Sequence, residues 1–153
     1  MQSGVSLRIK TDSALHFTGA IAQNAGEGED IALAMEVAAG KHCRGRIKAI
    51  AIQSVEARAW EVWLWSKSTK GVTGNVDTST LIGYWGFAAA DGLLVTGDAN
   101  YYYYIDGLDQ SYWDEDISGQ LHITLVNRSA AAKSADAAGA VSVRLFMDLS
   151  QGI

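Results

Sequence analysis

The chain has no proline and only one cysteine among its 153 residues, and each shortage narrows what the protein can be. Because Cys43 is alone, no disulfide can form within the chain, and nothing indicates a disulfide-stapled secreted fold. Proline is one of the residues that blunt the exposed edges of β-sheets. A β-protein without proline must protect its edges by a neighbouring subunit or by lysines and bulges, and the sequence leaves both open.

Long apolar runs and an excess of basic residues are also missing. No stretch approaches the roughly 18 apolar residues of a membrane-spanning helix, and the N-terminal MQSGVSLRIK lacks the apolar core of a signal peptide. The formal net charge of -5 disfavours nucleic acid as a partner, because its phosphate backbone would be repelled. We therefore expect a protein of an aqueous, cytoplasmic compartment that binds neither nucleic acid nor membrane.

The composition that remains is that of one ordinary globular domain. Hydrophobic residues make up 48% of the chain and charged residues 19%, and a chain of this length can bury a sizeable core. We predict a single domain over residues 1–153, in which 1–40 can include an N-terminal arm or extended attachment segment.

Apolar residues recur at every second position in several segments, as they do in half-buried strands. The clearest are Gln120–Arg128 and Val141–Leu149. In the range 46–56 the same alternation predicts that Ile50, Ile52 and Lys48 share one face and that Ile47 lies on the other. The further strands are predicted over 5–10, 31–37, 46–56, 60–66, 81–88 and 101–105.

These segments amount to about eight strands, with turn residues at the spacing typical of sandwiches and barrels. Glycine, present 16 times, supplies the turns. We expect the ranges 46–56 and 60–66 to pair as a hairpin, because only three residues separate them. The fold class predicted is all-β, an antiparallel β-sandwich that is jelly-roll-like.

Residues that carry chemistry are sparse. His16, His42 and His122 lie in three different segments, and the neighbours His42 and Cys43 would point to opposite faces of a strand. The chain contains no Gly-x-Ser-x-Gly turn, no phosphate-binding glycine loop and no dinucleotide fingerprint. We therefore predict no catalytic residue, no cofactor and no metal ligand.

One acidic segment offers an alternative to that prediction. Four aspartates lie close together in this segment: Asp106, Asp109, Asp114 and Asp116. Calcium takes roughly six to eight oxygen ligands, and the carboxylates of a loop can supply them. The spacing does not match an EF-hand loop, and solvated acidic loops are common. We expect no metal there that folding requires.

Aromatic residues gather in two places. On one strand Trp63 and Trp65 share a face, while Val62 and Leu64 take the opposite face, so both faces of this strand are apolar. In the run 101–104 one pair of tyrosines must point outward, because neighbouring residues of a strand alternate. We predict an interface or ligand platform among Trp60, Trp63, Trp65, Tyr101, Tyr103, Tyr112 and Trp113.

Several segments resemble small virion proteins of tailed phages. They are Trp60–Lys67, Leu81–Phe87, Tyr103–Leu108, Leu121–Ser129, Ala130–Ser134 and Val141–Arg144. The resemblance implies a virion component made in the host cytoplasm, either a capsid decoration (cement) protein or a tail-associated one. It implies no active-site residues.

Three functional hypotheses follow. The first is a structural virion protein, most simply a capsid decoration protein, which forms a homo-oligomer (a trimer is favoured) and contacts a major capsid or tail protein. The second is a carbohydrate-binding β-sandwich module or a tail-associated receptor-binding component. The third is a small enzyme that uses a pair of loop carboxylates as a glycosidase does. Of the three it has the least support, and we expect the chain not to be an enzyme.

Overall fold

The computed structural model describes residues 6–10, 17–32, 44–68, 78–116, 119–134 and 141–150. No helix among these residues is long and apolar enough to cross a membrane. The described residues form one short 3-10 helix, Ala89–Asp91, and ten strands: β1 (Ser6–Lys10), β2 (Gly26–Ala32), β3 (Arg44–Ser54), β4 (Trp60–Trp65), β5 (Leu81–Phe87), β6 (Leu93–Leu94), β7 (Tyr101–Ile105), β8 (Gln110–Trp113), β9 (Gln120–Asn127) and β10 (Val141–Ser150).

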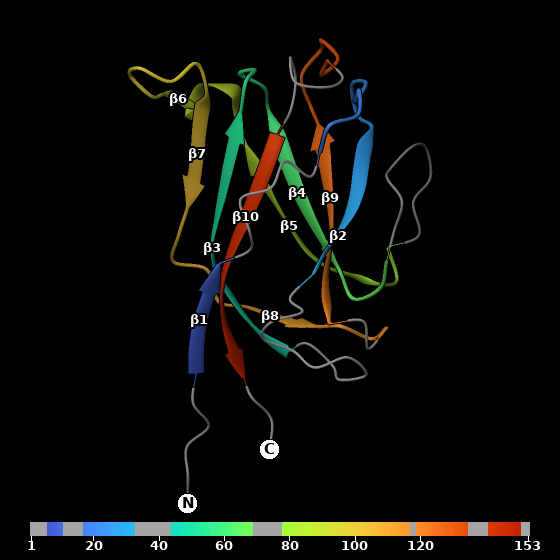
Figure 1. Cartoon of the computed structure of the whole chain (residues 1–153). Helices are drawn as coiled ribbons and strands as arrows, with labels where there is room; N and C mark the ends of the chain where they lie inside the picture. The colour runs from blue at the N-terminus through green and yellow to red at the C-terminus, as the bar shows by residue number, and fades with distance from the viewer. Residues whose placement is uncertain are drawn as a thin grey trace, which may run out of the picture.

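The strands pair into two antiparallel sheets that face each other (Figure 1). The six-stranded sheet has the order β1-β10-β3-β7-β6, with β8 also paired to β3, and the four-stranded sheet has the order β2-β9-β4-β5. When the short β6 and β8 are set aside, the remaining strands lie in the order of a jelly roll, in which the first and last strands are neighbours. The predicted fold class is confirmed.

The predicted hairpin between 46–56 and 60–66 is wrong. The strand β3 lies in the six-stranded sheet, where it pairs with β10, β7 and β8, whereas β4 pairs with β5 and β9 in the other sheet. The short link between them therefore crosses from one layer to the other. The two strands bury their apolar side chains against each other's sheets, from opposite sides of the core.

The core is one layer of side chains between the two sheets. From β9 it takes Leu121, Ile123 and Leu125, and from β10 it takes Val141, Val143, Leu145 and Met147, as the alternation predicted. Burying each such side chain contributes about 1.5–3 kcal/mol. This layer is what orients the remaining residues of each strand toward the two outer faces.

A bulge in β3 overturns one predicted face. Ile47, Ile50 and Ile52 are all buried in the core, although Ile47 was expected on the opposite face. Phe146 and Met147 of β10 are opposite Ala49 and Ile47, so Lys48 is an extra residue in β3. A bulge of this kind reverses the alternation at one point and is not visible in the pattern of apolar residues.

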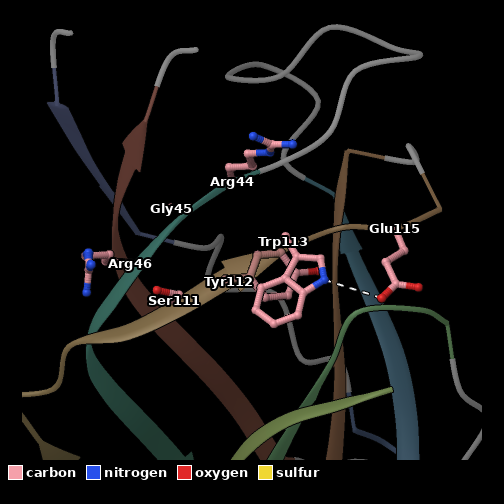
Figure 2. Close-up of a pocket in the computed structure, with 7 residues that line it drawn as sticks. All are labelled: Arg44, Gly45, Arg46, Ser111, Tyr112, Trp113 and Glu115. Carbon is pink, nitrogen blue, oxygen red and sulfur yellow. Dashed lines mark hydrogen bonds between the residues drawn. The ribbon is translucent and has the colours of Figure 1, made fainter. Parts of the chain in front are cut away.

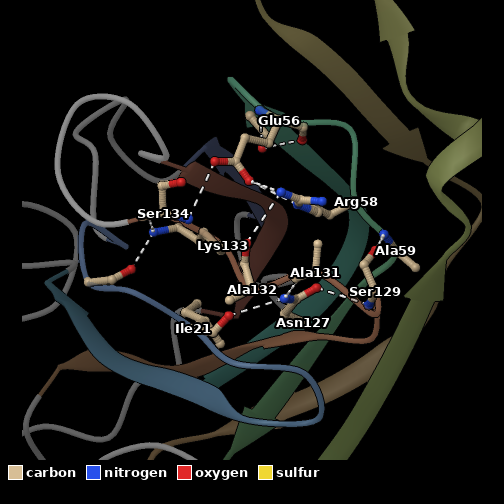
Figure 3. Close-up of polar contacts among 12 residues, drawn as sticks. Ile21, Glu56, Arg58, Ala59, Asn127, Ser129, Ala131, Ala132, Lys133 and Ser134 are labelled. Carbon is tan, nitrogen blue, oxygen red and sulfur yellow. Dashed lines mark hydrogen bonds and ion pairs between the residues drawn. The ribbon is translucent and has the colours of Figure 1, made fainter.

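Buried polar side chains tie the segment before β2 to the loop after β9 at one end of the sandwich (Figure 3). Asn127 is buried and donates from Nδ2 to the carbonyl oxygens of Ile21 (3.1 Å) and Ala131 (2.9 Å). The buried Lys133 donates from Nζ to the carbonyl oxygen of Gly19. Because the amide of Asn127 finds acceptors in the main chain, its burial carries no large penalty.

The predicted arm is only partly described. The strand β1 pairs with β10 along its whole length, and β2 pairs with β9, so both belong to the sandwich. Residues 1–5, 11–16 and 33–40 lie outside the described residues, so the structure describes only the start of the predicted strand 31–37.

The close packing of β3 against β10 gives a test of the fold. A methyl group on Gly45 would overlap the carbonyl oxygen of Asp148 and lie 2.9 Å from Cε of Met147, whereas at Gly86 it would meet only Cγ of Glu61, at 3.9 Å. We expect Gly45→Ala to lower the free energy of unfolding by about 1–3 kcal/mol and Gly86→Ala to change it by less than about 0.5 kcal/mol. Urea denaturation followed by circular dichroism measures both, and equal stability of the two variants would contradict this packing.

Candidate functional site

The outer face of the six-stranded sheet carries a group of exposed aromatic and apolar side chains. In β7, Tyr103 points into the core while Tyr104 points outward and is 52% exposed, so the predicted opposition of the tyrosines is confirmed. The Tyr104 ring meets the Phe146 ring edge to face, with centroids 6.3 Å apart. Tyr102 also points outward, opposite Leu93 of β6, which is 70% exposed. We call Leu93, Tyr102, Tyr104 and Phe146 the aromatic outer face.

Small side chains of β3 let these rings lie against the sheet. Ala51 is opposite Tyr104 in β7 and opposite Arg144 in β10, and its own side chain is buried. A larger residue at this central position would lift the neighbouring side chains away from the strand. The alanine therefore holds the aromatic outer face in a shallow and continuous arrangement.

Beyond the bulge, the other half of β3 carries an open groove of about 570 Å³ (Figure 2). Arg44 of β3 is opposite Trp113 of β8, and Arg46 is opposite Ser111, so these four side chains share one face. Trp113 is 43% exposed, and its Nε1 donates to Oε1 of Glu115 at 3.4 Å. We call this the arginine groove, and its lining residues are Arg44, Gly45, Arg46, Ser111, Tyr112, Trp113 and Glu115.

Charges of both signs border the arginine groove. Asp109 accepts hydrogen bonds from Lys48 (2.8 Å) and Arg46 (2.9 Å). The bond from Lys48, helped by the charges of Arg46 and Lys48, holds the pKa of Asp109 below its usual value. Hydrogen bonding by Ser66 and then by Trp113 likewise lowers the pKa of Glu115. Both carboxylates stay ionised at neutral pH, beside two arginines.

A second polar group lies around His122 of β9. Its Nδ1 is 2.9 Å from Oδ1 of Asp30, and its Nε2 is 3.0 Å from Oδ1 of the buried Asp114. A neutral imidazole has only one N–H. Both contacts can be hydrogen bonds only if the ring carries two hydrogens or if one carboxyl group is protonated. The histidine thus links β2 to the loop between β8 and β9.

The same group includes a serine, but not in the geometry of a nucleophile. Ser68 donates from Oγ to Oδ2 of Asp30 (2.6 Å) and from its backbone N–H to Oδ2 of Asp116 (2.8 Å). In a catalytic triad the hydroxyl donates to the imidazole, whereas here it donates to the carboxylate. We call Asp30, Ser68, Asp114, Asp116 and His122 the His122 cluster, and its hydrogen bonds join three parts of the chain.

Among the described residues, one set of side chains could hold a metal ion. Ligand atoms of Asp114, Asp116 and His122 lie within 4.8 Å of one another. The calcium set considered from the sequence is divided, because Asp109 is held by Arg46 and Lys48 and Asp106 is not part of this group. Two of the four predicted carboxylates therefore meet a histidine that the sequence did not connect with them.

The structure separates the seven aromatic residues of the predicted platform. Trp60, Tyr103 and Tyr112 lie in the core, and Trp65 is buried on the outer side of the four-stranded sheet, so almost no surface of these four residues is exposed to solvent. The Tyr103 hydroxyl donates to the carbonyl oxygen of Arg58 (2.9 Å), and burial raises the pKa of its phenol. Tyr101 is half-buried against the core.

Of the seven predicted residues, only two keep ring surface that a ligand could contact. Two aromatic residues outside the predicted set are exposed as well. Trp63 is half-buried and Trp113 is exposed, while Tyr84 (62% exposed) and Tyr104 were not in the predicted set. The alternation of β7 could have identified Tyr104 as soon as Tyr103 was assigned to the core. Tyr84 follows from the alternation of β5 only when the bulge between β4 and β5 is known.

Comparison of the chain with protein-family models, with curated proteins and with solved structures finds no match. The resemblance of its segments to virion proteins of tailed phages stays a prediction.

The carboxylates of the His122 cluster lead to a prediction about metals. We expect thermal melts in the presence of calcium and in the presence of a chelator to coincide, because main-chain N–H groups and His122 already bond these carboxylates. A ligand at a hundred times its dissociation constant would add about 2.7 kcal/mol of stability, which differential scanning fluorimetry resolves. A higher melting temperature with calcium would contradict the expectation and assign the ion to Asp114 and Asp116.

The burial of His122 leads to a second prediction. We expect His122→Ala to lower the free energy of unfolding by about 1–3 kcal/mol, because it removes the buried imidazole that contacts the carboxylates of Asp30 and Asp114. Asp109→Asn is the matched control. Asp109 likewise contacts two side chains of the opposite type, Arg46 and Lys48, but it is exposed, and we expect its replacement to change the stability little. Urea denaturation compares the two variants, and a small loss in His122→Ala would show that the cluster is not a structural link.

Proposed function

We propose that the chain is a structural subunit of a virus particle, a capsid decoration protein that stabilises the particle by contacts between subunits. The observation that carries the proposal is the outer side of the six-stranded sheet, where the aromatic outer face and the arginine groove lie on either side of the bulge in β3. The role is one of binding and assembly, with no catalytic step.

The residue types on this side of the molecule favour contact with another protein. Tyrosine, tryptophan and arginine are enriched at protein interfaces and supply most of the residues whose loss weakens binding. Tyr104, Trp113 and Arg44 are of these types and are all exposed. Large exposed apolar groups are uncommon on monomeric proteins unless they serve an interaction.

The edge of the same sheet adds support. Next to β7 the sheet ends in β6, only two residues long, and Leu93, Leu94 and the following Val95 are all exposed. Exposed apolar side chains at a sheet edge promote association with other chains, and no proline blunts this one. A neighbouring copy that covers residues 93–95 would protect it.

The fold is compatible with this role but does not by itself establish it. Jelly rolls occur in viral capsid proteins and in lectins, and a fold alone does not establish a function. The resemblance of several segments to virion proteins of tailed phages gives independent support for the first of these. A closed symmetric oligomer is the usual way to bury a self-complementary surface, and we propose a trimer seated on a major capsid or tail protein.

The proposal is tested by the oligomeric state of the purified protein. We expect sedimentation equilibrium to give a trimer and the variant Tyr104→Lys to shift it toward monomer, because a buried lysine charge at the contact is unpaired. The control is Tyr84→Lys, which places the same charge on an exposed tyrosine of the other sheet. We expect a loss of affinity of roughly thirtyfold or more for a central aromatic residue.

Two outcomes would contradict the proposal. One is a monomer at millimolar concentration that also fails to bind purified particles. The other is equal weakening of the assembly by both variants, which would mean that the outer side of the six-stranded sheet is not the contact.

A further inference from the structure

The outer face of the four-stranded sheet carries an aromatic pair that the proposed assembly contact does not use. Trp63 of β4 is directly opposite Tyr84 of β5, and their ring centroids are 6.1 Å apart at an angle of 48°. Tyr84 is 62% exposed and Trp63 half-buried, so together they offer ring surface to solvent. An exposed cross-strand pair of this kind stabilises a sheet modestly, but its surroundings are those of a binding site.

Trp65 gives this pair a rigid base. Its ring lies 5.8 Å from that of Trp63, and its Nε1 donates to the hydroxyl of Thr124 at 3.0 Å. The Trp65 side chain is fully buried, so it cannot rotate away. Trp63 is therefore supported from below and keeps one orientation.

The polar edge of Trp63 is also fixed. Its Nε1 donates to Oε2 of Glu61 at 2.7 Å, Nη2 of Arg128 donates to the same oxygen at 3.0 Å, and Nε of Arg128 forms an ion pair with Oε1 at 3.0 Å. Burial acts to raise the pKa of Glu61, but the hydrogen bonds from Arg128 and Trp63 and the charge of Arg128 outweigh it and lower that pKa. A charged carboxylate and a guanidinium thus stand beside the ring in one fixed arrangement.

A glycine leaves room next to these groups. Gly86 is opposite Glu61 on the same face, two residues after Tyr84, and a methyl group there would meet only Cγ of Glu61 within 4 Å. At this position no side chain of β5 stands next to Glu61. A ligand that rests on the rings can bring polar groups to the carboxylate and the guanidinium without displacing any side chain.

From this arrangement we infer a saccharide-binding site, formed by Glu61, Trp63, Tyr84, Gly86 and Arg128, whose ligand is a neutral pyranose residue of a polysaccharide. The apolar C–H face of the sugar ring lies on the aromatic rings, as apolar surface does at ligand sites. Vicinal hydroxyl groups need a donor and an acceptor side by side, and Arg128 and Glu61 supply both.

The hydrogen-bonding capacity of these two side chains is sufficient. A carboxylate has about four acceptor positions and a guanidinium five donors. Glu61 uses two acceptor positions in its hydrogen bonds from Trp63 and Arg128, and a third faces Nε of Arg128 in the ion pair. Arg128 uses one further N–H on the side chain of Asn24, at 3.2 Å. One acceptor and two donors remain. The carboxylate and the net charge of -5 disfavour an acidic sugar.

Affinity electrophoresis of the full chain tests this site. Native gels contain dextran, mixed-linkage β-glucan or mannan as neutral probes, and alginate as an acidic one. We expect at least one neutral polysaccharide to retard the protein and Tyr84→Ser to weaken that binding by about tenfold or more. Arg128→Met, which keeps the apolar stem of the side chain, should weaken it as well.

The matched control is Val55→Ser, which removes an exposed apolar side chain that belongs neither to this site nor to the proposed assembly contact and should bind the polysaccharide like the unmodified chain. Thermal melts of all three variants verify that they fold. The inference is overturned if no neutral probe retards the protein, if Tyr84→Ser is retarded as strongly as Val55→Ser, or if alginate is preferred. Because sedimentation and electrophoresis respond to tyrosines on different sheets, failure of this site and failure of the assembly proposal are distinguishable.

Discussion

The apolar layer between the two sheets is the constraint on which the remaining structure depends. Strands β3, β9 and β10 contribute an unbroken series of buried aliphatic side chains to it, and β4 adds Trp60, Val62 and Leu64. Since residues of a strand alternate in direction, filling this layer decides which residues point outward. Both candidate surfaces are consequences of it, because Tyr104 points out where Tyr103 points in, and Trp63 points out where Val62 points in.

How far the sequence predicts the fold depends on how regular each strand is. The strands β9 and β10 keep strict alternation, and their core residues were predicted correctly. The face of Ile47 was not, because a bulge is a property of the pairing between two strands and leaves no mark in the composition of either. The partner of β4 was mistaken for a similar reason, since proximity in the chain favours a hairpin while the jelly roll places β3 and β4 in opposite sheets.

The candidate sites were harder to predict than the core. Trp63 and Trp65 share a face, as expected, yet one is half-buried and the other fully buried, because Trp65 folds across β9 and bonds Thr124. The acidic loop was recognised, but its contact with His122 depends on the register of β2, β4 and β9, which no single segment encodes. Alternation gives the direction of a side chain, and only the assembled sheets give its surroundings.

The pairing of β1 with β10 has a consequence for the synthesis of the chain. The strand β10 lies in the middle of its sheet, between β1 and β3, although it is the last of the described strands to be translated (Figure 1). A ribosome adds about 5–20 residues per second, so for some seconds β1 and β3 have emerged while the strand that joins them has not. Sequence-distant pairing of this kind slows folding. Until β10 is made, the nascent chain therefore exposes an unpaired edge of β1 and of β3, and a chaperone that covers these edges would protect its yield.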